Sequence, residues 1–244
     1  MKKSICIIAT LFLSISILAQ KPLESLFDPK DMQHDLKLFR EIRDAANSGV
    51  YKYRTKKEID SIYAWAEKEI LHSSTLREFH NILWQITDFE GSLHNAIHLH
   101  FKTRKALREE TKGYFPYPIK IIEGKVLLNI NTNDISIGSE ILSINGEAIT
   151  NILPQLYKYY TTDGFNLTGK EIGINENFSQ YYRLNHGLKD HFQVTYKDPT
   201  TAEIRSIEIE SVGYRAYYKN FEKRHSLASD SLSYEGTKGI QYTF

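Results

Sequence analysis

The chain reads Gly138-Ser-Glu-Ile-Leu-Ser-Ile-Asn-Gly-Glu147 just past its midpoint, and this stretch decides the fold. Its apolar side chains at Ile141, Leu142 and Ile144 predict a short strand that enters a small sheet. Asn145-Gly146 follows, and this dipeptide tolerates the positive φ angles of a hairpin turn best. The stretch therefore predicts a β-strand that ends in a tight turn toward the next element.

The residues on either side extend this β region to at least five strands. Residues 119–122 and 126–130 flank Glu123-Gly124, which predicts a second tight hairpin. Apolar residues alternate over residues 192–196 and again over residues 204–209, and the segment between them has turn chemistry. Residues 149–160 between these hairpins predict a helix, in which Pro154 is allowable only in the first turn.

The first half of the chain predicts three antiparallel helices over residues 28–88. Asp28-Pro29 is an N-cap followed by proline at the first helical position. Thr55-Lys-Lys-Glu58 and Thr75-Leu-Arg-Glu78 are capping boxes, in which the threonine oxygen and the glutamate satisfy free backbone donors at a helix start. An apolar stripe at helical spacing follows each box.

Three further segments have less regular patterns. From Ala96 the apolar residues alternate with His98 and His100, which predicts a strand. Residues 102–112 are highly charged and predict a solvated connector or a short helix. Residues 214–225 predict one more helix, residues 226–239 have a linker composition, and residues 240–244 alternate like a strand, either of a new sheet or returning to the existing one.

The first residues predict the compartment. Lys2 and Lys3 precede an apolar run over residues 5–18, and Ala19 offers a small residue for cleavage, which is typical of a secretory signal peptide. The alternative is an uncleaved membrane anchor. Cys6 is the single cysteine and falls in this segment, so the exported protein has no thiol chemistry. With 31 basic and 30 acidic residues the chain is nearly neutral, which argues against nucleic acid as a partner.

The segment from Gly138 to Glu147 is similar to the Gly-Asp-x-Ile-Leu-x-Ile-Asn-Gly segment of bacterial PDZ domains, and it departs from that pattern at Ser139-Glu140. Residues 116–125 add a Pro-x-x-Ile-x-Ile-x-x-Gly-Lys stretch, and residues 163–166 add Asp-Gly-x-Asn. With the export signal and the helical cap, the chain resembles envelope serine peptidases of the carboxyl-terminal processing (tail-specific) family over nearly all of residues 28–244.

The resemblance implies an α+β fold with an N-terminal helical cap, followed by a small PDZ-like β domain with one or two helices. Its expected parts are a signal peptide (1–19), the cap (20–95), the PDZ-like domain (96–213), and a linker helix with the start of a truncated catalytic domain (214–244). The family's serine nucleophile and lysine base belong to the missing module, so we assign no catalytic residue and no cofactor. We expect this chain to be inactive by itself and to be exported to the periplasm or beyond, without a stable membrane anchor.

The implied partner is a peptide or the C-terminus of an unfolded protein. PDZ domains capture such ligands by β-augmentation, in which an extended ligand adds to a sheet edge while backbone amides hold its carboxylate. The predicted peptide-binding residues are Gly113, Tyr114, Phe115, Ile119 and Ile121. A packed hairpin lead-in with a degenerate groove is the alternative for this segment. A stand-alone, non-enzymatic periplasmic peptide-binding module is the alternative for the whole protein, and the oligomeric state is left open.

Three histidines offer a competing chemistry. His94 and His98 are four residues apart, which on a helix puts two imidazoles on one face as zinc ligands, and His100 follows. Asn95 stands where a metalloprotease places its glutamate base, and the neighbouring residues predict a strand. Structural or solvated histidines are therefore expected and no metal site is assigned, with a small zinc protein as the alternative.

Overall fold

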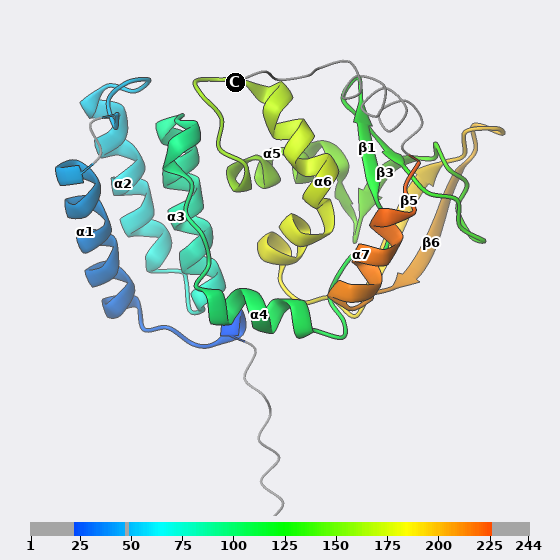
Figure 1. The fold of residues 1–244 in the computed structure, drawn as a ribbon, viewed down its shortest axis with the longest axis horizontal. Coiled ribbons are helices and arrows are strands. Elements are labelled where there is room, and N and C mark those ends of the chain that lie inside the picture. Colours follow the sequence, from blue (N-terminus) through cyan, green and yellow to red (C-terminus); the bar gives the residue numbers. More distant parts are fainter. Residues whose placement is uncertain (1–21, 47–48, 226–244) are drawn as a thin grey trace, which may run out of the picture.

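The computed structural model describes residues 22–46 and 49–225. These residues form an α+β fold, in which helices at one side and an antiparallel sheet at the other are separated by a further pair of helices (Figure 1). The expected signal peptide (1–19), linker (226–239) and last strand (240–244) lie outside the described residues.

The cap consists of the three predicted helices. They are α1 (Pro29–Ala46), α2 (Lys56–Ile70) and α3 (Leu76–Glu90), preceded by the short 3-10 turn η1 (Pro22–Glu24). Both predicted capping boxes are confirmed, because Thr55 and Thr75 each accept the backbone N–H of the glutamate three residues on, and that glutamate accepts the N–H of the threonine. The buried faces of the three helices enclose one apolar cluster around Ile59, Ala66 and Ile86.

The strand predicted from Ala96 is wrong. Residues 96–100 are an extended connection without a strand partner, between the 3-10 turn η2 (Leu93–Asn95) and α4 (Phe101–Glu109). The alternation that suggested a strand is nevertheless real, because Leu99 is buried while His98 and His100 are exposed. An extended chain over an apolar surface gives the same period of two as a strand in a sheet.

The sheet has six strands, and every pairing in it is antiparallel. The strand order is β1 (Ile119–Ile122), β2 (Lys125–Leu128), β3 (Glu140–Ile144), β5 (His191–Lys197) and β6 (Ile204–Glu210), with β4 (Glu147–Ala148) also on β3. Both predicted two-residue turns are confirmed: φ is 51° and 76° at Glu123 and Gly124, and 52° and 80° at Asn145 and Gly146. Three of the five connections between consecutive described strands, β1–β2, β3–β4 and β5–β6, therefore follow from short apolar runs and turn residues.

Helices cover the inner side of this sheet. They are α5 (Ile149–Leu156) with the 3-10 turn η3 (Tyr157–Tyr159), and α6 (Leu167–His186), while α7 (Tyr214–Glu222) packs against α4. Helices were predicted over residues 149–160 and 214–225, but Pro154 lies beyond the first turn of α5, two residues before the helix ends. The twenty residues of α6 were not predicted. The second apolar cluster lies between these helices and the sheet, around Ile144, Ile152, Phe178 and Phe192.

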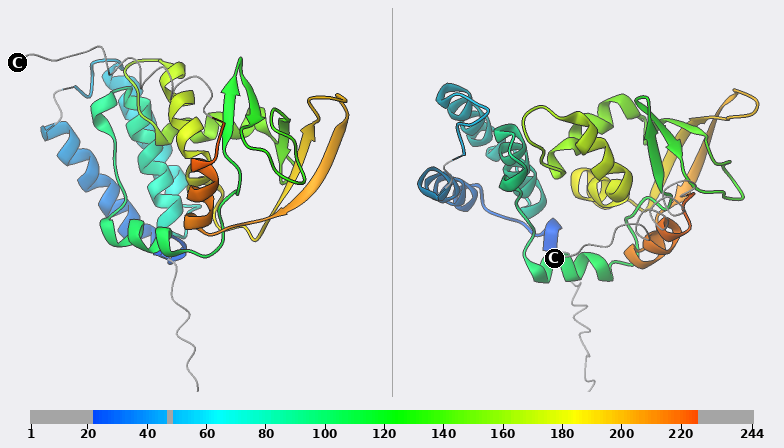
Figure 2. Two further views of the ribbon diagram at one scale, coloured as in Figure 1. Left: turned by 45° about the vertical axis from the view of Figure 1, so that its right-hand side comes forward. Right: turned by 45° about the horizontal axis from the view of Figure 1, so that its top comes forward.

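The cap packs on the α5–α6 layer, which stands between α3 and the sheet in both figures (Figures 1 and 2). A third apolar cluster of Leu23, Trp84, Leu99 and Leu107 lies where the parts meet. Polar contacts add to it: Arg77 donates to the carbonyl of Asn185 at 2.7 Å, and Asn81 donates to that of Leu184 at 3.1 Å. Because each part buries apolar surface against the other, the cap and the sheet behave as one folded unit.

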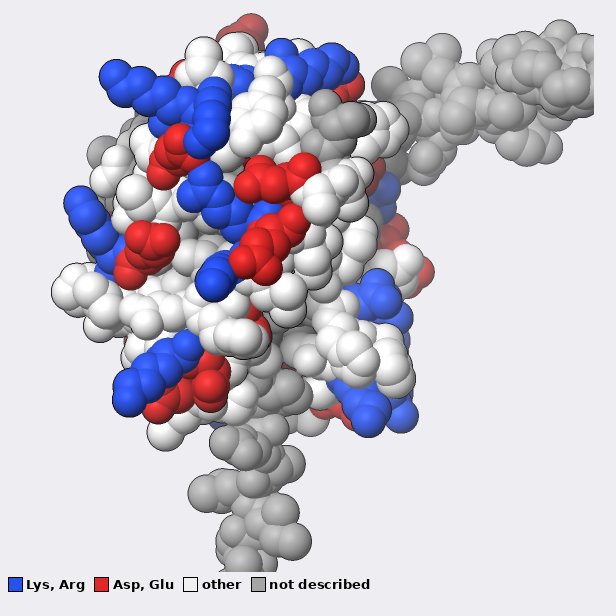
Figure 3. Space-filling view, turned by 90° about the vertical axis from the view of Figure 1, so that its left-hand side faces the viewer, with Lys and Arg blue, Asp and Glu red and all other residues white. Residues whose placement is uncertain are grey.

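The outer face of the cap carries charges of both signs in close alternation (Figure 3). Several are helical i, i+4 pairs, such as Lys37–Glu41 at 3.9 Å and Lys56–Asp60 at 2.7 Å. Such exposed pairs contribute little stability, but they keep the surface free of a field of one sign. In the part of the chain that the structure describes, no helix is long and apolar enough to cross a membrane.

Candidate functional site

The outer edge of β1 is the first candidate site. A hairpin with a two-residue loop pairs the residues that flank the loop, so Ile122 and Lys120 direct their N–H and C=O groups toward β2. Ile119 and Ile121 therefore direct theirs away from β2. At this edge α6 packs against β1, and the Ile121 N–H donates to Asn175 Oδ1 at 2.7 Å.

The five residues predicted to bind peptide lie together but serve the fold in different ways. Ile119, Ile121 and Phe115 are buried in the apolar cluster beneath the sheet, so their backbones rather than their side chains are available at the edge. Tyr114 forms an isolated antiparallel bridge with Val212, with both N–H to O distances at 3.0 Å. Gly113, at φ 104°, donates its N–H to Ser211 Oγ at 3.1 Å. The amides of Gly113 and Tyr114 are thus already paired, and peptide binding at these residues stays a prediction.

Asp88 and Glu90 are not the solvated acids that their place near a helix end indicates. Glu90 is fully buried, where Arg43 donates to its Oε1 at 2.7 Å and Asn95 donates to its Oε2 at 2.7 Å. Asp88 pairs with the buried amine of Lys170 on α6. Burial raises the pKa of both carboxyl groups, and their cationic partners oppose this. Both acids hold neighbouring segments together, which is a structural role.

The Asp163-Gly-x-Asn166 motif of the family resemblance contacts the turn that follows α3. Gly164 donates its N–H to the carbonyl of Gly91 at 2.8 Å, and Leu93 donates its N–H to Asp163 Oδ1 at 3.1 Å. Gly91 ends α3 in the left-handed conformation at φ 71°. The turn after the cap and the loop before α6 are therefore locked together.

The three histidines do not converge. His94 lies in η2, and His100 caps α4, where its Nδ1 accepts the N–H of Lys102 at 3.4 Å. His98 lies between them on the extended connection. Within residues 22–46 and 49–225 no group of three or more His, Cys, Asp or Glu side chains is placed to hold a metal ion. The structure gives the zinc alternative no support.

Lys158 is the lysine whose environment most favours the neutral amine that a serine peptidase base needs. Burial, with a smaller effect of the neighbouring Arg77, lowers its pKa to about 8. Its Nζ donates to Asn185 Oδ1 at 2.5 Å. Because that partner is an amide oxygen and not a hydroxyl, the contact positions α6 against η3 and provides no nucleophile.

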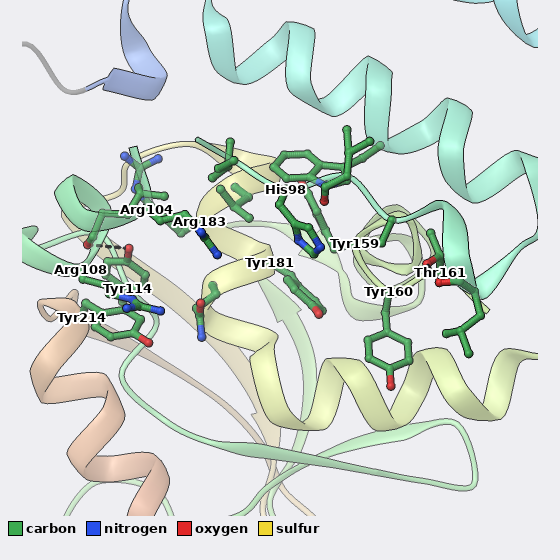
Figure 4. Close-up of a pocket in the computed structure, with 18 residues that line it drawn as sticks. His98, Arg104, Arg108, Tyr114, Tyr159, Tyr160, Thr161, Tyr181, Arg183 and Tyr214 are labelled. Atoms are coloured by element: carbon green, nitrogen blue, oxygen red, sulfur yellow. Dashed lines mark hydrogen bonds between the residues drawn. The ribbon is translucent and has the colours of Figure 1, made fainter. Parts of the chain in front are cut away.

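A cavity of about 430 Å³ lies between the cap and the β part of the chain (Figure 4). It is lined by α3, the connection before α4, α4 itself, η3, α6 and α7. Its aromatic lining consists of Trp84, Tyr114, Tyr159, Tyr160, Tyr181 and Tyr214. Three arginines, Arg104, Arg108 and Arg183, also line it, together with His98. Of these residues only Tyr114 and His98 were singled out from the sequence.

Comparisons with known proteins place the fold. A crystal structure of mature CPAF matches with a TM-score of 0.50 at 14% identity, over 82% of this chain and 39% of the CPAF chain. A crystal structure of a serine-to-alanine variant of CPAF matches with the same TM-score and identity, over 75% and 34%. No family model and no curated protein matches the sequence. This chain therefore shares its fold with part of CPAF, and it spans less than half of the length of the CPAF chain.

Proposed function

We propose that this protein is the substrate-recognition portion of an exported serine-type endopeptidase of the carboxyl-terminal processing family, and that it binds peptides or the C-termini of unfolded proteins. Two findings support this: the fold is shared with part of CPAF, and the segment from Gly138 to Glu147, which resembles PDZ domains, forms the strand and turn expected of it. Export, recognition and membership of this family are parts of one proposal.

The observation that carries the proposal is the hydrogen bond from the Ile121 N–H to Asn175 Oδ1. The carbonyl of an extended peptide offers the same acceptor to an edge strand. The Asn175 side chain is half-buried at a place where a ligand strand would lie, between β1 and α6. We propose that the Asn175 side chain substitutes for the peptide: its Oδ1 accepts the Ile121 N–H until the carbonyl of a bound peptide replaces it.

Gly113, Tyr114 and Phe115 have a positioning role in this scheme. The bridge from Tyr114 to Val212 and the burial of Phe115 fix where β1 begins. Ile119 and Ile121 then supply the backbone groups that a ligand strand pairs with. The ligand's specificity is left to the side chains of α6 that face this edge.

Titration of a fluorescently labelled, extended peptide tests the proposal by fluorescence anisotropy. Asn175→Ala removes the competing acceptor, so we expect the peptide to bind several-fold more tightly, since a hydrogen bond to a neutral group is worth about 1 kcal/mol. Asn151→Ala, on the exposed side of α5, is the matched control and should bind as the unaltered protein does.

Circular dichroism would first establish that each variant is folded. If neither the unaltered protein nor Asn175→Ala shows saturable binding, or if both asparagine variants change affinity equally, β1 is not the recognition edge.

A further inference from the structure

The cavity between the cap and the β part of the chain is chemically asymmetric. Arg104, Arg108 and Arg183 lie at one end of it, beside Tyr114 and Tyr214, while Tyr159, Tyr160 and Thr161 lie at the other (Figure 4). No aspartate or glutamate is among the residues that line it. A cavity with cations at one end and rings at the other has a preferred direction for a ligand.

Of the three arginines at this end, only Arg183 is neutralised by acidic side chains of the described residues. Arg183 is fully buried, and its guanidinium donates to the carboxylate of Glu110 at 2.7 and 3.1 Å and to that of Glu24 at 2.8 Å. Arg104 and Arg108 are exposed, and neither forms an ion pair with an acidic side chain of the described residues. They are four residues apart on α4, which places both on one face of that helix.

The other end presents flat aromatic surface. Tyr159 and Tyr181 stack with ring centroids 5.2 Å apart, and Trp84 meets the edge of Tyr159 at 4.8 Å. The Tyr159 hydroxyl donates to Asn81 and the Tyr114 hydroxyl to the carbonyl of Leu107, so both rings are held in place. Rings fixed by their own hydrogen bonds form a wall that needs no rearrangement to receive a ligand.

We infer that this cavity is a second ligand site, which binds a small organic anion with a flat apolar body. The carboxylate or another anionic group of the ligand pairs with Arg104 and Arg108, and the body lies against Trp84, Tyr159 and Tyr181. The volume of about 430 Å³ is in the range of small-molecule sites. Tyr114, which precedes the peptide edge, lines the cavity, but no residue of β1 does. The cavity is therefore a different site from the edge of β1 and does not depend on the proposed function.

Isothermal titration calorimetry of the purified protein with 1-naphthylacetate and with its neutral amide tests the charge requirement. We expect the acid to bind about tenfold or more tightly than the amide, because charge-assisted hydrogen bonds to arginine are among the stronger polar contacts. Trp84 lines the cavity, so its fluorescence should change in parallel.

Variants of α4 and of the wall locate the site. The double variant R104Q/R108Q should lose the preference for the acid, while Lys105→Gln, on the same helix but outside the lining, should keep it. Ala96→Trp fills the cavity and should abolish binding of both compounds. Asn175→Ala, which acts on the peptide edge, should leave naphthylacetate binding unchanged.

A competition experiment distinguishes two sources of the anionic group, the C-terminus of a peptide and a free small acid. A hexapeptide that ends in tryptophan displaces naphthylacetate if the natural ligand is a peptide end, and leaves it bound if the ligand is a free small acid. Equal affinity for acid and amide, an R104Q/R108Q variant that behaves like Lys105→Gln, or no binding to the folded protein would overturn the assignment.

Discussion

At Gly146 a single backbone angle determines which residues the position accepts. This glycine has φ 80°, and nothing lies within 4 Å of the position that a Cβ atom would take. A side chain at this position is therefore disfavoured by the backbone conformation alone and not by a clash with a neighbouring residue. Because the residue lies in the two-residue turn between β3 and β4, its conformation also fixes the register of these two strands.

Gly146→Val should lower the free energy of unfolding by about 1–2 kcal/mol, because a β-branched residue is strained in the left-handed region. Gly146→Asn is the matched control and should cost much less, since asparagine tolerates this region. Urea unfolding measures both. Equal loss in the two variants would mean that the turn adopts another conformation.

His186 makes stability depend on pH. Burial lowers its pKa to about 4, although Glu147, at 3.8 Å, opposes the shift. In the unfolded chain a histidine titrates near 6.5. Between pH 6.5 and 4 the unfolded state therefore binds a proton that the folded state does not, so the stabilising contribution is present above pH 6.5 and is lost as the pH falls through 4.

We expect the urea midpoint to fall less steeply between pH 7 and 4 in His186→Gln than in the unaltered protein. His191→Gln is the control, because half of the His191 side chain is exposed, and it should retain the full slope. A His186→Gln slope equal to that of the control would show that His186 is protonated in the folded protein.

The helix starts show what short motifs specify. In the box before α2, Glu58 N–H donates to Thr55 Oγ1 at 3.3 Å, and Thr55 N–H donates to Glu58 Oε2 at 2.8 Å. Thr55→Ala removes the side-chain acceptor and should cost about 1 kcal/mol in chemical unfolding. Thr55→Ser keeps the hydroxyl and should cost far less. A loss no larger for alanine than for serine would contradict this role for the cap.

Capping boxes and two-residue turns could be predicted because the residues that form them are close in sequence. The helix α6 could not, because Gly169, Gly173, Asn175 and Asn177 give its sequence little helical preference. Its backbone is non-helical at Asn177, with φ −130° and ψ 16°. The helix is therefore stabilised by its packing against the sheet and the cap and not by the helical propensity of its residues. The strand predicted from Ala96 was wrong because the local pattern was clear but the tertiary pairing was absent: the alternation comes from an extended connection without a strand partner.

Only part of the candidate site could be predicted. Ile119 and Ile121 follow from the sheet-edge pattern, but their acceptor, Asn175, lies on the helix that was missed. The cavity brings together side chains from seven separate segments, and no spacing in the sequence relates Arg104 to Tyr159 or Trp84. Sites assembled from distant segments need the tertiary arrangement to be recognised.

At the scale of the whole molecule, the cap and the sheet should unfold together. Buried pairs such as Lys170 with Asp88, and Arg183 with Glu24, join the two parts, and the apolar cluster around Trp84 lies between them. Differential scanning calorimetry should therefore show one transition whose calorimetric and van't Hoff enthalpies agree. Two separate transitions would show that the cap is an independent unit.

The bridge between Tyr114 and Val212 has a topological consequence. Gly113 and Ser211 beside it are 98 residues apart in the chain, yet they too are joined by a hydrogen bond. The chain therefore enters and leaves the stretch between them at adjoining points, although residues of α6 within it also contact the cap. A segment whose two ends lie close together can be lengthened, shortened or exchanged in evolution without changing the distance that the rest of the fold must span. Recombination could thus replace this whole stretch as a cassette while α4 and α7 remain in contact.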